Sequence, residues 1–232
     1  MPRLPRVVLP GFAHHVTQRG VRRGDIFFDD GDRALYLRHM SEQTEKFGVR
    51  ILCYCLMTNH VHLLAVPESA TALASAIGEA HRRYTWQLNR RIGATGYLFQ
   101  GRFASCPLGE SHLGAAARYV LLNPVRACLV SRACDYRWSS AAFHAGEAKD
   151  DPLVEANDLM GLLADARAWR QLMESEATVK QEDYLRQVTR TGRPSGDAAF
   201  VREAEWVCGR DLMPRKRGPK VDESPIVAVD EN

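Results

Sequence analysis

Several features are missing from this 232-residue sequence, and each absence excludes a class of protein. No apolar run approaches the ~20 residues of a membrane-spanning helix. The N-terminal residues contain two arginines but no apolar signal core. The six cysteines are scattered without a C-x-x-C pair, and no segment repeats. These absences argue against a membrane protein and a disulfide-stapled secreted domain, and we expect a cytoplasmic globular protein.

Charge is distributed unevenly along the chain. Residues 1–103 carry 14 basic and 8 acidic side chains, whereas residues 142–184 carry 4 and 10. Residues 185–220 are basic again, with 9 and 4. A basic first half and a basic tail suit a phosphate backbone, but an uneven solvated surface gives the same pattern. Charge alone therefore leaves nucleic-acid binding open.

Hydrophobic periodicity predicts four strands and three helices in the first part of the chain. The predicted strands are Ala13 to Arg19, Val49 to Met57, His60 to Val66 and Phe99 to Leu108, and the predicted helices are Asp32 to Phe47, Thr71 to Arg91 and Glu110 to Leu122. A turn at Thr58 and Asn59 makes the second and third strands a hairpin, and Pro124 is expected to kink the last helix. This order predicts an α+β fold, namely a ferredoxin-like split βαβ antiparallel sheet with helices on one face.

The pattern weakens after residue 145, which suggests three regions. Residues 1–145 form the predicted main domain. Residues 146–213 are predicted as a helical extension, with a helix from Ala156 to about Met173. Residues 214–232 contain the run Pro-Arg-Lys-Arg-Gly-Pro-Lys and are predicted to be a basic, disordered tail.

His60 and His62 open a predicted strand and are separated by one residue, so both imidazoles point to the same face. Two imidazoles side by side are a natural metal-binding pair. Two histidines on a strand are also common as ordinary core or surface residues. Their apolar neighbours favour a central strand, where titratable groups need partners.

Tyr119 and Asn123 are four residues apart on a predicted helix and therefore lie on one face. A phenol and a carboxamide on one face can act at a single point. The alternative is that Tyr119 is a core residue with its hydroxyl directed outward.

Four segments together resemble a known family. They run from Phe12 to Gly20, Cys55 to Leu64, Leu98 to Phe103 and Ala117 to Ala127, and they look like segments of the single-tyrosine HUH transposases. The last segment most resembles the REP-associated tyrosine transposase branch. The resemblance covers about residues 5–145.

The resemblance implies a role for each matching residue. His60 and His62 match the metal-binding pair, Tyr119 matches the nucleophile, and Asn123 takes the place of a polar third ligand that is often glutamine. The implied reaction cuts single-stranded DNA through a 5′-phosphotyrosine link with a free 3′-hydroxyl, which conserves the bond energy for rejoining. A divalent metal would offset the charge of the phosphodiester, and a protonated phenol needs such help. Imidazole suits Mn, Ni or Zn better than Mg, whereas the family is usually described with Mg or Mn.

The implied partner is single-stranded DNA folded as a hairpin. The protein would bind it in the cytoplasm as a monomer or a homodimer. Basic or amide side chains in three places could contact phosphates or base edges. They are Arg19, Arg22 and Arg23 after the first strand, Arg82 and Arg83 on the long helix, and Gln100 and Arg102 at the entry to the fourth strand. Each of them could equally be a solvated surface residue.

Two other functions remain open at this point. A protein that binds hairpin DNA and regulates without cutting would keep the basic surface, although the presence of His60, His62 and Tyr119 argues against it. A metal-dependent phosphodiester hydrolase would need a carboxylate base beside the histidines, and the residue before His60 is Asn59.

Overall fold

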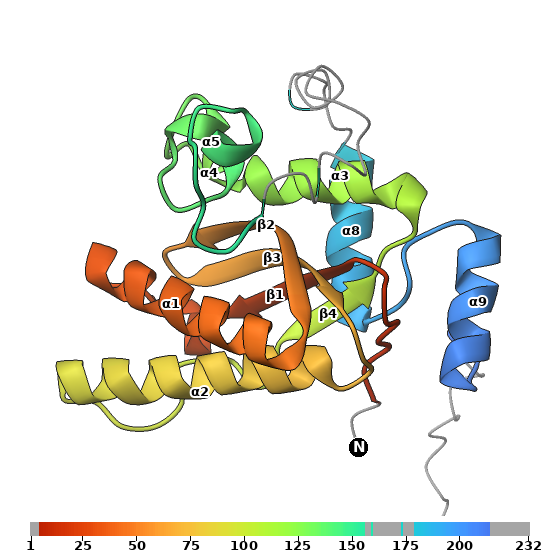
Figure 1. Ribbon diagram of the computed structural model, residues 1–232, viewed down its shortest axis with the longest axis horizontal. Coiled ribbons are helices and arrows are strands. Elements are labelled where there is room, and N and C mark those ends of the chain that lie inside the picture. The colour runs from red at the N-terminus through yellow and green to blue at the C-terminus, as the bar shows by residue number, and fades with distance from the viewer. Residues whose placement is uncertain (1–4, 156–158, 160–172, 174–178, 214–232) are drawn as a thin grey trace, which may run out of the picture.

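The computed structural model describes residues 5–155, 159, 173 and 179–213 (Figure 1). The predicted helix from Ala156 to about Met173 and the predicted tail 214–232 lie, apart from residues 159 and 173, outside these described residues. The main elements are β1 (His14–Arg19), α1 (Asp30–Phe47), β2 (Val49–Met57), β3 (His60–Pro67), α2 (Ala72–Ile92), β4 (Ala104–Pro107), α3 (Glu110–Leu121), α4 (Asn123–Arg126), α5 (Ala141–His144), α8 (Val179–Thr191) and α9 (Ala198–Cys208). Two short 3-10 turns, η1 (Val21–Arg23) and η2 (Ala133–Asp135), complete them.

The four strands form one antiparallel sheet in the order β2-β3-β1-β4. With α1 between β1 and β2, and α2 between β3 and β4, this is the ferredoxin-like arrangement, which confirms the predicted α+β class. The hairpin of β2 and β3 closes tightly, with Met57 opposite His60. β3 and β1 are the two central strands and pair directly, so side chains at the start of β3 lie next to side chains of β1 in the middle of the sheet.

The helices cover both faces of the sheet, which corrects the expectation of helices on one face. α1 and α2 lie on one side, and α3 and α8 lie on the other (Figure 1). The reason is visible in β2 and β3, whose residues are nearly all buried, with Arg50 the one exposed position in β2. A strand that is apolar on both faces needs a covering layer on each.

Local signals set the helix ends. The Asp29 side chain accepts a hydrogen bond from the backbone N–H of Asp32 and so caps the start of α1. Gly48 ends α1 in the left-handed conformation, with a φ of 64°. α3 ends at Leu121, and the chain re-enters a short helix at Asn123, as expected because proline at position 124 supplies no N–H donor.

The fourth strand is shorter than predicted. β4 begins at Ala104, whereas Phe99 makes only a single bridge to Gly20. Between them Gly101 has a φ of 66°, a conformation that interrupts an extended strand. Gln100 and Arg102 therefore lie in a loop at the edge of the sheet.

The C-terminal extension is packed into the domain. Leu185 and Val188 of α8 belong to the same apolar core as Leu113 and Val120 of α3. In α9, Phe200 packs with Val7, Leu9 and their neighbours near the N-terminus. Within the described part of the chain, no helix combines the length and hydropathy that crossing a membrane requires.

Candidate active site

His60 and His62 lie where β3 begins, on the face of the sheet that α3 covers. Their ring centroids are 5.0 Å apart, and the ring planes are nearly perpendicular. His62 is buried between Thr17 of β1 and Cys55 of β2, and His60 pairs with Arg19 and Met57. The two imidazoles therefore share one face of a central strand, as the spacing predicts.

A chain of hydrogen bonds fixes the tautomer of His62. The Thr189 hydroxyl donates to the backbone oxygen of Leu185 (2.8 Å), so it accepts from Nδ1–H of His15 (2.7 Å). The unprotonated Nε2 of His15 then accepts from Nδ1–H of His62 (2.9 Å). A neutral imidazole carries one proton. His62 therefore presents the lone pair of its Nε2.

A second chain fixes His60 in the same way. The amide nitrogen of Asn59 donates to the backbone oxygen of Arg23 (3.0 Å), which leaves Asn59 Oδ1 facing His60. Nδ1–H of His60 donates to that oxygen at 2.6 Å. Consequently the Nε2 of His60 also presents a lone pair. Ligating histidines in metalloproteins typically have their other ring nitrogen held in this way.

Burial keeps these imidazoles neutral. It lowers the pKa of His60 to about 4 and, for His15, to about 3. The pKa of His62 is also well below its usual range, first because of burial and then because its proton would be repelled by the charge that His15 and His60 carry when protonated and by the charges of Arg126 and Arg19. At neutral pH both strand histidines are thus in the form that binds metal.

Tyr119 lies on α3 beside His62 and His15. Its ring centroid is 5.5 Å from that of His62 and 5.7 Å from that of His15, with the rings edge-on. The guanidinium of Arg126 sits 4.2 Å from the centre of the phenol ring, and Nε of Arg186 donates to the phenol oxygen at 3.2 Å. Two guanidinium groups therefore contact the phenol, one at its oxygen and one at its ring, and Arg186 is also paired with Asp183 (2.8 Å).

Asn123 lies one turn after Tyr119, but its amide nitrogen is used by the helix. Nδ2 donates to the backbone oxygens of Tyr119 (3.0 Å) and Val120 (3.3 Å) near the end of α3, and Arg126 also donates to the Tyr119 oxygen (2.8 Å). The side-chain oxygen remains as its ligand atom. Its predicted role in a metal shell stays a prediction.

The donor set fits a divalent cation without forming a closed cage. Among residues 5–155, 159, 173 and 179–213, no group of three or more His, Cys, Asp and Glu side chains is arranged to hold a metal. If a divalent cation bound to the two imidazole lone pairs, with the Asn123 oxygen as the predicted third ligand, coordination positions would remain for substrate and water, as catalytic sites require.

The predicted DNA contacts are in four different environments. Arg19 ends β1 opposite His60. Arg22 and Arg23 form an exposed turn with left-handed φ values of 54° and 64°, which non-glycine residues rarely adopt. Arg82 and Arg83 on α2 both pair with Glu79, so their charge is partly neutralised. Gln100 and Arg102 line a cleft at the edge of the sheet.

Four residues around the candidate site were not singled out from the sequence. His15 could have been found, because it lies one strand away from His62 on the same face. Arg126 follows Tyr119 by seven residues, two helical turns, and so was also within reach of periodicity. Arg186 and Thr189 lie on α8, about 70 residues after Tyr119, and no local pattern points to their contact.

Comparison with known proteins agrees with this architecture. Residues 11–122 match the family model described as "Transposase IS200 like". The fold is similar to the structure of a REP-associated tyrosine transposase bound to a REP hairpin, with a TM-score of 0.51 and 16% identity over 68% of this chain and 93% of that one. A proposed transposase from Deinococcus radiodurans R1 aligns with a TM-score of 0.36 and 15% identity over 56% of this chain and 92% of that one. No curated protein matches the sequence significantly.

The domain that holds His60, His62 and Tyr119 is therefore an IS200-like transposase domain. Residues 11–122 thus match this transposase family, which supports a DNA-processing role, and the ferredoxin-like fold of the chain is similar to that of a REP-associated tyrosine transposase.

Proposed function

We propose that the protein cuts and rejoins single-stranded hairpin DNA with Tyr119 as the nucleophile, and that it belongs to the REP-associated branch. The observation that carries the proposal is the position of Tyr119: its hydroxyl accepts a hydrogen bond from Arg186, and its ring lies 5.5 Å from the ring of His62, whose Nε2 lone pair is available. A tyrosine of the core alone would not need a guanidinium on its oxygen and another on its ring.

In the proposed step, the phenol oxygen of Tyr119 attacks the phosphorus of a phosphodiester. The bond from oxygen to phosphorus forms as the bond from phosphorus to the 3′ oxygen breaks, and overall the phenol proton is replaced by one on the leaving 3′ hydroxyl. Arg186 and Arg126 stabilise the negative charge that builds up around the phenol oxygen and the phosphate. The product is a 5′-phosphotyrosine link, and its reversal by another 3′ hydroxyl rejoins a strand without an external energy source.

His60 and His62, with the Asn123 oxygen as a third ligand, would hold a divalent metal such as Mg or Mn. When bound, it would withdraw charge from a non-bridging phosphate oxygen. The residues of the chain prepare the site by keeping both imidazoles neutral and by holding each Nδ1–H on a fixed partner, His15 or Asn59.

The hairpin substrate is proposed from the similar fold of a transposase that binds a REP hairpin. The exposed turn at Arg22 and Arg23 supports it, because it connects to His60 through Asn59. Phosphate binding at this turn would bring the DNA backbone to the side of the histidines.

The test is to mix the protein with hairpin DNA from its own genomic neighbourhood, labelled at the 5′ or 3′ side of the expected cut, with Mn or Mg. A denaturing gel should show DNA covalently bound to the protein, and the adduct should disappear in Tyr119→Phe and in His60→Ala. Cleavage that survives Tyr119→Phe would favour the hydrolase. Binding without cleavage under either metal would favour the regulator.

A further inference from the structure

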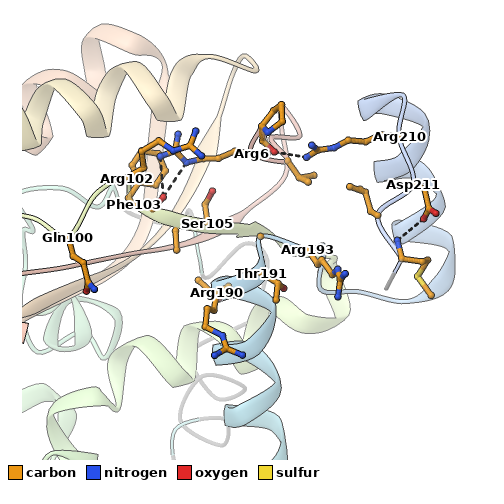
Figure 2. Close-up of a pocket in the computed structure, with 17 residues that line it drawn as sticks. Arg6, Gln100, Arg102, Phe103, Ser105, Arg190, Thr191, Arg193, Arg210 and Asp211 are labelled. Carbon is orange, nitrogen blue, oxygen red and sulfur yellow. Dashed lines mark hydrogen bonds between the residues drawn. The ribbon is translucent and has the colours of Figure 1, made fainter. Parts of the chain in front are cut away.

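We propose that a cleft along the outer edge of β4 binds the unpaired strand of the DNA. This inference deepens the proposed function and rests on it for the identity of the substrate. The cleft has a volume of about 800 Å³ and is lined by the N-terminal segment, the loop before β4, the end of α8 and the residues after α9 (Figure 2). Much of it is therefore built by the extension, which lies outside the matched family segment 11–122.

The charge of this cleft suits a polyanion. Its described lining contains five arginines and a single acidic residue, Asp211; the arginines are Arg6, Arg102, Arg190, Arg193 and Arg210. They come from four separate segments of the chain, and Figure 2 shows them around one hollow. Arginines gathered on a concave surface concentrate positive potential there, which is the physical requirement for phosphate binding.

Two of these arginines are held close together. Arg6 donates to the backbone oxygen of Phe103 through Nε (3.2 Å) and Nη2 (3.1 Å), and its guanidinium stacks on the Phe103 ring at 3.7 Å. Burial lowers the pKa of Arg6, and the charge of Arg102 lowers it further. The fold thus keeps two like charges side by side, and a bound phosphate would relieve their repulsion.

A neighbouring hollow indicates that the nucleic acid is single-stranded. It shares Arg6, Arg102 and Phe103 with the cleft, and its wall includes Trp86 and Tyr97. Tyr97 is 93% exposed and Trp86 is 58% exposed, although large aromatic side chains are normally covered. Exposed aromatic rings beside arginines form a surface on which unpaired bases stack, whereas duplex bases are already stacked on each other.

The cleft leads to the candidate active site along α8. Arg186 contacts the Tyr119 hydroxyl and Thr189 contacts His15, while Thr189 and Arg190 also line the cleft. Four residues of helix, from Arg186 to Arg190, span about 6 Å. A strand held in the cleft would thus enter the site from the end of α8.

The experiment measures DNA binding in the Tyr119→Phe background, where no covalent link forms. The test variant adds Arg190→Ala and Arg193→Ala, and the matched control adds Arg38→Ala and Lys46→Ala, which remove two exposed positive charges from α1. Fluorescence anisotropy measures the binding of two DNAs. One is a hairpin that carries an unpaired extension of about ten nucleotides on each side, and the other is the same hairpin without extensions. Each is titrated at several salt concentrations.

We expect the test variant to bind the extended hairpin at least tenfold more weakly and the control to stay within about twofold. The slope of log affinity against log salt should become shallower by about 1.4, since each lost contact to single-stranded phosphate contributes about 0.7. The blunt hairpin should bind as before. Unchanged affinity for the extended hairpin, or an equal loss for both hairpins, would overturn the proposal.

Stacking is tested separately with Trp86→Ala and Tyr97→Ala, each expected to weaken binding of the extended hairpin about fivefold or more. Trp86→Phe and Tyr97→Phe keep an aromatic face and should retain most of the affinity for the extended hairpin. Equal losses in the alanine and phenylalanine variants would contradict stacking. If the wild-type protein forms no adduct but the arginine variant still binds the extended hairpin more weakly, the proposed reaction is wrong, whereas the proposed role of the cleft in DNA binding stands.

Discussion

The two faces of the sheet bury histidines in different ways. On the face covered by α1 and α2, His81 and Tyr36 form a hydrogen bond of 3.0 Å inside an aromatic cluster, where Phe99 stacks on His81. On the face covered by α3 and α8, His15 and His62 also form a hydrogen bond, of 2.9 Å. Burial lowers the pKa of histidines on both faces. Neither burial nor a shifted pKa therefore distinguishes a structural histidine from a candidate ligand.

What differs is the atom that each network leaves over. The network of His62 runs through His15 to Thr189 and ends on a backbone oxygen, so every donor is used and the Nε2 lone pair of His62 remains. The same is true of His60 through Asn59. Beside His62 lies the phenol ring of Tyr119, which two guanidinium groups contact, whereas His81 is enclosed by aromatic rings. The comparison teaches that a site is recognised by its unused coordinating atoms.

The largest expected effect separates the two faces directly. His62→Ala should reduce adduct formation by more than 100-fold, because a lost ligand removes several kcal/mol of charge stabilisation. Tyr36→Phe should leave adduct formation unchanged and lower the free energy of unfolding by about 1 kcal/mol through one lost hydrogen bond. Gel assays and urea unfolding measure the two effects. Equal losses of activity in both variants would remove the distinction between the faces.

The next effect tests whether His15 positions His62. His15→Phe keeps a ring but removes the acceptor of His62 Nδ1–H, so His62 can move its proton to Nε2, the nitrogen that would bind metal. We expect a 10–100-fold loss of Mn affinity, measured as the Mn dependence of cleavage. The ¹⁵N shifts of the His62 ring should change to the other tautomer. Cys106→Ala, which alters another neighbour of Thr189, is the control. An unchanged tautomer would show that His15 only fills space.

Sequence patterns predicted the strands and most helices because these depend on local periodicity, whereas the candidate site residues were assigned from the resemblance to a family and their roles stay predictions. The spacing of His60 and His62 on a strand, and of Tyr119 and Asn123 on a helix, determines their faces before the fold is known. The covering of both faces was missed, although β2 and β3 are apolar throughout. Arg186, Thr189 and the cleft were beyond reach, because a contact between residues 119 and 186 depends on tertiary packing alone.

The pH dependence of stability should sharpen the comparison further. Below about pH 6.5 the histidines of the unfolded chain take up protons, whereas burial lowers the pKa of folded His81 to about 3 and keeps it neutral. The contribution of His81 to the free energy of unfolding is therefore fully present above pH 6.5 and is lost as the pH drops toward 3. At pH 5 the loss from His81 alone is about 2 kcal/mol. In a chelator, His81→Gln should reduce the difference in unfolding free energy between pH 7 and pH 5 by this amount, and an unchanged difference would contradict it.

The smallest effect concerns the outer end of the candidate site. Asn59→Ala removes the acceptor of His60 Nδ1–H and the donor to the backbone oxygen of Arg23. Since His60 is less buried than His62, water can replace the lost acceptor, and we expect a loss of Mn affinity of about tenfold, at the low end for such supporting groups. Asn59→Asp should restore the acceptor for His60 but not the bond to Arg23. If Asn59→Asp recovers Mn affinity but not hairpin binding, then Asn59 has two separate roles: it holds His60 for the metal, and it holds the Arg22–Arg23 turn for the DNA. If neither variant changes Mn affinity, His60 does not depend on its partner, and the parallel between the two strand histidines fails.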